Sequence, residues 1–277
     1  MKKNIFFLFI LITFYNKTNA QGCVAIRTVG GLNTMEHAMH HMMDSAMGIS
    51  NNKMVEPKWD LNISGRYFKS YKHFSGTTEN TQRVAESTDV RNFSRTMDIS
   101  LVRKVNNQWS IGLDLPLVYN ERSSLYEHIS SVKGSPRFST FSQGIGDIRI
   151  TAYKWIFAPK EGNKGNLLGG IGLKLPTGNY KATDVFHNTL TTTRVGPVDQ
   201  SIQPGDGGLG LTLELNGFRA INNTWSLYSN VYYLINPKGN NGVSTARGGV
   251  ATASAIKYTS DVMSVPDQYL LLSLIHI

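Results

Sequence analysis

The sequence predicts an all-β protein, an antiparallel transmembrane β-barrel, and three observations lead to this prediction. Several stretches alternate between apolar and polar residues with a period of two, as strands with two different faces do. Aromatic residues often stand at the ends of the apolar faces, and charged residues recur on the opposite faces. Connections between the stretches are alternately short and long. Bacterial outer-membrane barrels combine these features, with a lipid-facing outside, a polar inside, short periplasmic turns and long external loops.

Composition is consistent with this fold class. The chain has 277 residues, of which 17% are charged, against about 25% in a typical soluble domain. The net charge is +9, and removal of three leader lysines leaves 25 basic and 19 acidic residues, or +6. These basic residues are scattered rather than gathered in a stripe, which argues against nucleic acid as a partner. The single cysteine, Cys23, excludes an intrachain disulfide and a CxxC zinc site.

Residues 1–20 have the three parts of a signal peptide. Lys2 and Lys3 form a positive start, Ile5–Tyr15 is an apolar run, and small residues precede a cut after Ala20. The apolar run is short for a membrane-spanning helix, which needs roughly 17–25 residues. Export is therefore predicted. Cys23 then lies near the mature N-terminus, either as a free thiol or as an acylated anchor.

Residues 21–57 form an N-terminal periplasmic segment rich in Met and His. His37, His40 and His41 have the i, i+3, i+4 spacing that places side chains on one face of a helix. Together with Met39 and Met43 they make a ligand set of imidazole and thioether, which suits copper. The alternative is a mobile or plug-like segment whose methionines pack loosely against the barrel.

The barrel itself is predicted over residues 58–277. Its clearest strand is Lys58–Tyr71, where Trp59 and Tyr67 enclose an apolar face and polar residues alternate with it. Seven strands are predicted, at Lys58–Tyr71, Arg95–Val105, Gln108–Asn120, 144–157, 167–175, Leu209–Phe218 and Thr224–Ile235. Long loops are predicted at His73–Asn92, Glu121–Gln143, Asn179–Gly208 and Asn236–Val265, and short turns at Asn106, Ala158–Asn166 and Asn222.

The C-terminal stretch Pro266–Ile277 begins like an eighth strand and then loses the alternation. The chain is therefore predicted to be an eight-stranded barrel or a truncated part of a larger one, with roughly ten to twelve strands. A secreted β-sandwich is the main rival fold. Predicted strands of about 10 to 14 residues are long for a sandwich and fit tilted membrane strands better.

Charged residues on the polar strand faces are the candidate lumen-lining residues. They are Asp60, Arg66, Asp98, Asp114, Asp147, Arg149, Lys174 and Glu214. On the lipid side a basic residue would cost of order 2–4 kcal/mol near the midplane, whereas inside a barrel opposite charges can pair. With eight strands the interior is filled and these residues form a structural plug, and with more strands they line a path for solutes.

Two glycine-rich motifs carry a family resemblance. Residues 144–148 read GIGDI and residues 172–178 read GLKLPTG. This combination resembles the phenol-degradation-pathway (MetA-pathway) outer-membrane transporter family, which is related in style to fatty-acid transporter barrels. The resemblance implies a barrel that passes small hydrophobic or aromatic compounds. The usage of Asn, Lys and Tyr and the QGC start at Gln21 look like a Bacteroidetes-type exported protein.

The predicted function is a channel or transporter in the cell outer membrane, with membrane lipid and a small hydrophobic or aromatic solute as partners. Two alternatives are a barrel that binds partners through its loops and an exported copper-binding protein. The chain has neither a G-x-S-x-G nor an HExxH motif, and His73, His128 and His187 fall in predicted loops. No catalytic residue, enzymatic activity or cofactor is predicted, and the oligomeric state is left open.

Overall fold

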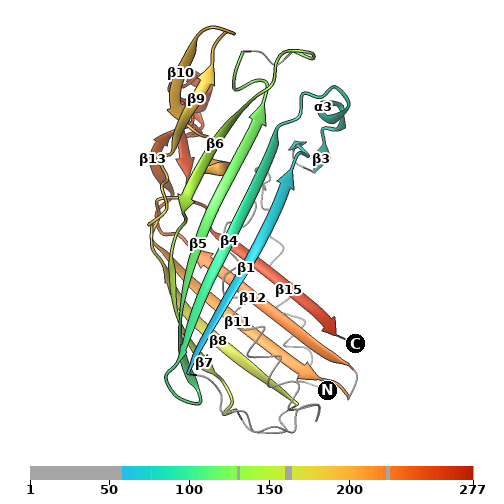
Figure 1. Ribbon diagram of the computed structural model, residues 1–277, viewed down its shortest axis with the longest axis vertical. Coiled ribbons are helices and arrows are strands. Elements are labelled where there is room, and N and C mark those ends of the chain that lie inside the picture. The colour runs from blue at the N-terminus through green and yellow to red at the C-terminus, as the bar shows by residue number, and fades with distance from the viewer. Residues whose placement is uncertain (1–57, 76, 130–131, 160–163, 223–224, 277) are drawn as a thin grey trace.

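The protein is all-β, and its main sheet is antiparallel and curls into a half-barrel (Figure 1). The computed structural model describes residues 58–75, 77–129, 132–159, 164–222 and 225–276. The long strands of this sheet are β1 (Trp59–Ser70), β4 (Arg91–Lys104), β5 (Trp109–Ser124), β6 (Phe138–Ile145), β7 (Arg149–Trp155), β8 (Gly165–Lys174), β11 (Gly210–Ala220), β12 (Ser226–Ile235) and β15 (Gln268–His276). Their order is β1-β4-β5-β7-β8-β11-β12-β15, with β6 beside β5.

The described strands form an open sheet, whereas the sequence predicted either an eight-stranded barrel or a truncated part of a larger one. β1 lies at one margin and pairs with β4, while β15 lies at the other and pairs with β12. The eighth strand predicted at Pro266–Ile277 is present as β15, which runs antiparallel to β12 from Gln268 to His276. Loss of alternation did not prevent pairing, because strand pairing uses backbone groups that every residue except proline carries.

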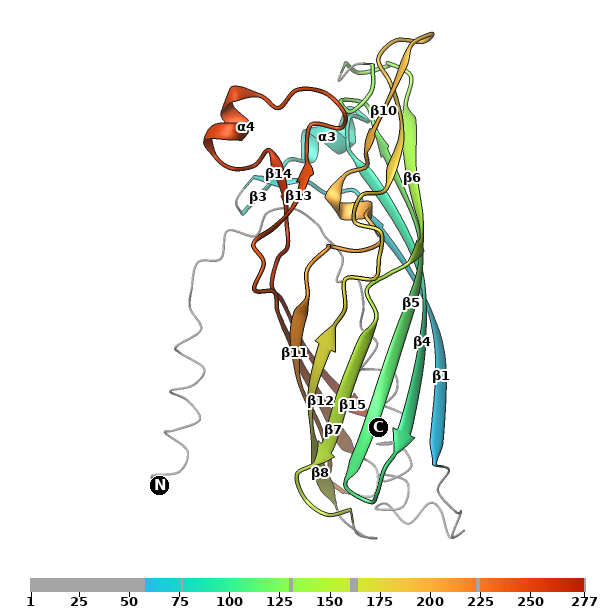
Figure 2. The same ribbon diagram turned by 90° about the vertical axis from the view of Figure 1, so that its left-hand side faces the viewer.

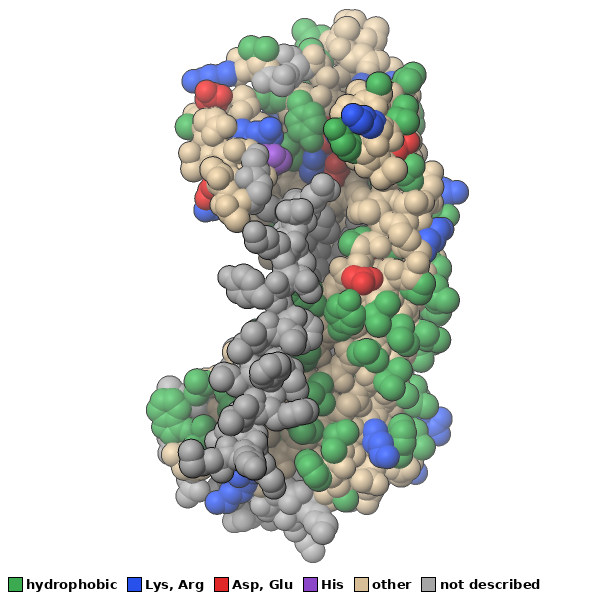
Figure 3. All heavy atoms as spheres, turned by 180° about the vertical axis from the view of Figure 1, so that it is seen from behind, with side chains coloured by type: hydrophobic (Ala, Val, Ile, Leu, Met, Phe, Trp, Pro, Cys, Tyr) green, Lys and Arg blue, Asp and Glu red, His purple; other side chains and the backbone are tan. Residues whose placement is uncertain are grey.

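The strands in the middle of the wall each have one buried face and one exposed face. In β11 the residues Thr212, Glu214 and Asn216 are buried on the concave inner face, whereas Leu213 and Leu215 are exposed on the convex outer face. The same alternation runs through β5, β8 and β12. Hydrophobic side chains cover the outer surface of the wall between its two ends (Figure 3). The predicted two-faced strand pattern is confirmed.

Aromatic side chains paired with basic ones stand at both ends of the outer face. At one end Arg103 lies over the ring of Trp59 at 5.4 Å and Lys154 over that of Trp109 at 5.0 Å. At the other end Arg95 lies between the rings of Tyr67 and Tyr119, at 5.7 and 5.6 Å. A cation is attracted to the flat face of an aromatic ring. These pairs lie at the two limits of the apolar band.

Short turns close one end of the wall, called here the short-turn end. Between β4 and β5, the side-chain oxygen of Asn106 accepts hydrogen bonds from the amides of Gln108 and Trp109, both at 2.9 Å. Between β11 and β12, Asn222 accepts from the amide of Trp225 at 2.7 Å. At both places the asparagine side chain accepts hydrogen bonds in the way a backbone carbonyl would.

The opposite, long-loop end carries the small elements (Figures 1 and 2). They are β2 (Phe74–Ser75), β3 (Thr78–Glu79), α3 (Thr81–Ala85), β9 (Thr183–His187), β10 (Thr193–Pro197), η1 (Gln200–Ile202), β13 (Asn240–Ser244), α4 (Ala253–Lys257) and β14 (Val262–Ser264). The predicted alternation of short and long connections is confirmed. The prediction of plain loops there was wrong, because these connections contain hairpins and helical turns.

The single strand predicted at residues 144–157 covers the last two residues of β6, an interruption and the whole of β7. β6 pairs with the upper half of β5, from Ser124↔Phe138 to Leu117↔Ile145, and β7 pairs with its lower half. The interruption falls at Gly146, where an added Cβ would lie 2.9 Å from the ring of Pro116. β5 therefore continues four residues beyond Asn120, and the predicted loop Glu121–Gln143 was too long at both ends.

Within the described part of the chain, no helix is both long enough and apolar enough to cross a membrane.

Candidate functional site

Seven of the eight predicted lumen-lining residues lie on strands, with their side chains on the inner face, and Asp147 lies in the connection between β6 and β7. Six of the eight are buried: Asp98, Asp114, Asp147, Arg149, Lys174 and Glu214. Asp60 and Arg66 lie on the same face of β1, at the margin of the sheet, and are half-buried. The structure brings five of these six buried residues together in two networks, and the sixth, Asp98 on β4, interacts with the charges of Arg66 and Arg149.

The first network surrounds Arg149, the first residue of β7. Its guanidinium lies 3.0 Å from a carboxylate oxygen of Asp114 on β5 and 3.8 Å from one of Glu214 on β11. The ring of Tyr232 on β12 lies 5.1 Å from the guanidinium, and the hydroxyl of Tyr153 donates to Glu214 at 3.2 Å. A buried arginine is tolerated only with such compensation. The network joins four strands of the wall, β5, β7, β11 and β12.

The second network lies where β8 leaves the wall. The ammonium of Lys174 contacts both carboxylate oxygens of Asp206 and lies 3.7 Å from Asp147. Asp147 in turn accepts hydrogen bonds from the amides of Gly178 and Asp206, both at 3.0 Å. Asp206 was not among the predicted lumen-lining residues, because its glycine-rich stretch was interpreted as a turn that enters the next strand.

Glycines make the wall thin beside these networks. A Cβ at Gly170 would lie 2.8 Å from the ring of Tyr153. A Cβ at Gly172 would lie 2.4 and 2.5 Å from the hydroxyl oxygens of Thr151 and Thr212. Only glycine allows the side chains of the neighbouring strands to lie across β8 in this way.

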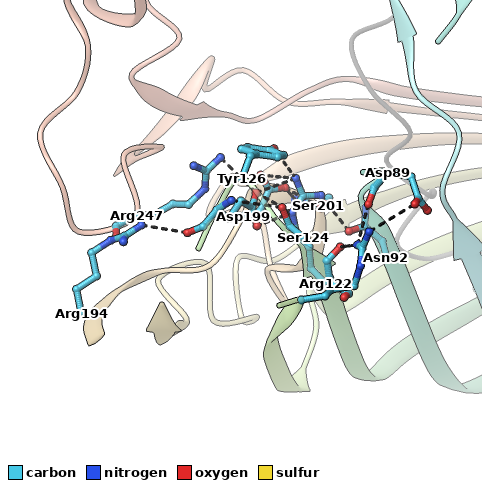
Figure 4. A network of polar contacts seen from close by, with 12 residues as sticks. Asp89, Asn92, Arg122, Ser124, Tyr126, Arg194, Asp199, Ser201 and Arg247 are labelled. Carbon is cyan, nitrogen blue, oxygen red and sulfur yellow. Dashed lines mark hydrogen bonds and ion pairs between the residues drawn. The ribbon is translucent and has the colours of Figure 1, made fainter. Parts of the chain in front are cut away.

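A third network, at the long-loop end, is centred on Arg122 near the end of β5 (Figure 4). The guanidinium donates to Glu127 at 3.0 Å, to Asn92 at 2.9 Å and to Tyr126 at 3.1 Å. It also donates to Ser201 at 3.2 Å and lies 3.4 Å from Asp199. The sequence reading placed Arg122 in a loop. The signal that could have found it is the parity of β5, because Asn120, Arg122 and Ser124 continue the buried positions of Gly112 and Asp114.

Glu127 joins this network to the chain segments after β8 and after β12. Its carboxylate pairs with Arg122 and also with Arg247, at 3.2 Å. The carbonyl oxygens of Arg247 and Glu127 accept hydrogen bonds from Arg194, at 3.1 and 3.2 Å. Burial by itself raises the pKa of the Asp199 carboxyl, but Arg122 and two hydrogen bonds from Ser201 outweigh it and hold this pKa below its usual value. The connections after β5, β8 and β12 are therefore held together by charge.

Asp89 holds the connection before β4. It accepts two hydrogen bonds from Arg91, at 2.8 and 3.2 Å, and lies 3.5 Å from Arg137. Burial acts to raise the pKa of Asp89, but the bonds and charges of the two arginines lower it below its usual value.

Two histidines of the predicted loops pack together. His187 ends β9, so it lies in a strand, and His128 lies in the connection after β5. His128 Nδ1 accepts a hydrogen bond from the amide of His187 at 3.1 Å. Its ring lies 5.6 Å from that of Phe138 and 5.5 Å from that of Phe186. This arrangement is an aromatic cluster.

The predicted copper ligands His37, Met39, His40, His41 and Met43 lie outside the described residues, as do the predicted leader, Cys23 and the rest of residues 21–57. Where the chain is described, no group of three or more His, Cys, Asp or Glu side chains is placed to hold a metal ion.

Fold and networks together define a class: an all-β protein whose antiparallel sheet curls around a polar, charge-paired inner face and exposes an apolar outer face. No protein-family model matches the chain, and no curated protein matches it.

Proposed function

We propose that the protein is an outer-membrane β-barrel that works as a channel or transporter for small solutes. One observation carries this proposal: β5, β8, β11 and β12 expose mainly apolar side chains on the outer face, whereas their charged and amide side chains are buried on the inner face. An apolar outer face gains free energy from contact with lipid, and a polar inner face needs water. Closure of the wall into a complete barrel is part of the proposal.

The height of the apolar band supports a membrane setting. On β5 the outward aromatic residues Trp109 and Tyr119 are ten residues apart. Ten residues extend about 34 Å along a strand, or about 26 Å in height at a tilt of about 40°. Barrels in the outer membrane have an apolar band about 25 Å tall. In this setting the short-turn end faces the periplasm, the long-loop end faces outside, and residues 1–20 are the export signal.

The solute class is the one that the family resemblance implies, a small hydrophobic or aromatic compound. Tyr153, Leu168, Phe218 and Tyr228 form an apolar cluster on the inner side of the wall, with Trp155 against it. Paired charges of Arg149, Asp114 and Glu214 lie beside Tyr153. An inner face with both kinds of surface supports an aromatic solute that also carries a polar group.

A surface-interaction barrel is the second candidate. The observation that favours it is the set of exposed apolar side chains at the long-loop end, such as Leu190, Val250 and Tyr258. Copper binding by residues 34–47 stays a prediction.

Conductance of the purified full-length protein in planar lipid bilayers tests the proposal. We expect discrete openings, and we expect aromatic solutes to reduce the current through them as they pass. The same preparation unfolded by heat is the control and should give no openings. A folded, membrane-inserted protein that neither conducts nor takes up solute into vesicles would favour the surface-interaction barrel instead.

A further inference from the structure

The connection between β8 and β11 turns back into the half-barrel over residues 198–208, called here the inner segment. Its side chains Val198, Ile202, Gln203 and Asp206 are each at most 4% exposed. The turn η1 within it packs against β4 and β5. Figure 2 shows this turn in orange below β10, on the concave side of the wall.

The first anchor of the inner segment is the carbonyl oxygen of Ile202. It accepts hydrogen bonds from Asn120 on β5, at 3.0 Å, and from Ser142 on β6. Asn120 and Ser142 are paired across the two strands and are buried. Their neighbours Tyr119 and Phe141 are exposed on the outer face. Because side chains alternate along a strand, the inner segment must lie on the inner side of the wall.

Two charged anchors hold the segment at its ends. Near the start, Asp199 and Ser201 contact the guanidinium of Arg122. Near the finish, Asp206 pairs with Lys174, its amide donates to Asp147, and its carbonyl accepts from Asn241 at 3.0 Å.

The side chain of Gln203 supports the segment from within and also joins it to Ala182, directly before β9. The side chain of Gln203 donates to the carbonyls of Val198 and Ala182, at 2.9 and 3.1 Å, and accepts from the amide of Ala182 at 2.9 Å. An external loop that simply crossed the surface would bond to water. Here the carbonyl of Ile202 accepts hydrogen bonds from side chains of the inner wall, and these bonds hold the segment inside the half-barrel.

We propose that the inner segment is a fixed constriction at the outer mouth of the barrel and that it limits the size of solute that can enter. This inference rests on the proposed channel function and adds the element that sets the bore. Its level follows from Asn120, which directly follows the outer aromatic residue Tyr119. Pore diameter at the narrowest point governs which solutes pass. The position of this segment would therefore limit solute size more strongly than the wider space enclosed by the strands below it.

Two release variants and one control test the proposal in planar bilayers. Asn120→Ala/Ser142→Ala removes both hydrogen bonds to the carbonyl oxygen of Ile202, and Asp199→Ala removes the pairing with Arg122. The control is Asn216→Ala/Asn230→Ala, which also deletes two polar side chains of the inner wall but removes a bond that these two make with each other. Folding of each variant is checked by heat-modifiable migration in gels. Asp199→Ala keeps the test available if the double variant does not fold.

We expect each release variant to raise the unit conductance at least about twofold and to admit larger neutral polymers, while the control stays close to the wild type. A silent wild type with conducting release variants would also support the constriction, although it would contradict an open native channel. A conducting wild type with unchanged release variants would overturn the constriction and leave the channel function intact. An equal increase in the control, or silence in wild type and release variants alike, would overturn it as well.

Discussion

At the scale of single residues, the wall depends on the absence of side chains as much as on their presence. Gly172 lies between Thr151 and Thr212 in the register of β7, β8 and β11. A Cβ there would also lie 2.8 Å from the carbonyl oxygen of Ile150. The backbone oxygen cannot rotate away, so the strands themselves would have to move.

We therefore expect Gly172→Ala to lower the free energy of unfolding by about 1–3 kcal/mol, as overpacking does in other tightly packed sites. Urea unfolding of the purified protein in detergent measures this. Gly65→Ala is the matched control, because a Cβ at Gly65 would have nothing within 4 Å. Equal stability of the two variants would contradict the close packing.

Residue positions were predictable from the sequence to the extent that they depend on strand parity. Alternation alone predicted that Asp114, Arg149 and Glu214 share the inner side. It did not predict that Arg149 would lie between the other two, because this depends on the register of β5, β7 and β11. Arg122 and Asp206 were missed, because the first lay past a predicted strand end and the second had no strand pattern around it.

At the scale of elements, the hairpin of β9 and β10 is attached to the wall partly through His128. The amide of His187 needs an acceptor there, and the Nδ1 atom of neutral His128 supplies it. Burial is the main cause that lowers the pKa of His128 below its ordinary 6.5. Glu127 raises this pKa, and His187, Arg194 and Arg247 lower it.

The hairpin should therefore lose stability in acid. The pKa of His128 is lower in the folded state, so the full stabilisation is present above pH 6.5 and is lost as the pH falls through the folded-state value. Protonated Nδ1 would become a donor and lose the His187 amide. Amide hydrogen exchange of β9 between about pH 7.5 and 5, expressed as protection factors, measures the effect.

His128→Gln is the control for this prediction, since glutamine keeps an acceptor and does not titrate. Its β9 protection should change little over the same pH range. The same acid-induced loss in wild type and variant would show that another group is responsible.

Elements were predictable where they are long and two-faced, as β1, β5 and β11 are. Short elements such as β9 and β13 gave no recognisable pattern, because five residues hold too few alternations. The interruption at Gly146 also escaped prediction. Gly146 lies beside the ring of Pro116 there, and these two residues, which are distant in the sequence, become neighbours only when β5 and β6 pair.

At the scale of the whole molecule, a solvent-exposed apolar face distinguishes a membrane wall from a sheet in water. Leu113 and Val250 are both exposed apolar residues, at 42% and 94%. Leu113 lies on β5 between Trp109 and Tyr119, inside the apolar band, whereas Val250 lies in the connection after β12, at the long-loop end.

We expect Leu113→Lys to destabilise the protein folded in lipid vesicles, lowering its free energy of unfolding by about 2–4 kcal/mol, the cost of a lysine near the midplane. Val250→Lys should change it little. Equal, small effects would show that the outer face meets water, and the membrane proposal would then be wrong.

The sequence could not decide between a closed ring and an open sheet. Alternation records the two faces of each strand but not its neighbours, so it predicts the curvature and closure of a sheet poorly. Charge pairing across the inner face depends on the same neighbours. Long-range register therefore explains most of what the sequence left undetermined in both the fold and the networks.

The length of β5 determines how far the long-loop end extends beyond the proposed bilayer. Its 16 residues extend about 54 Å along the strand, or about 41 Å in height at a tilt of about 40°. A lipid band about 25 Å tall then leaves about 15 Å of strand above the bilayer. In the proposed membrane, Arg122 lies on this portion of β5 and Glu127 lies in the connection directly after it. An antibody or a phage could reach the loops around them without meeting lipid.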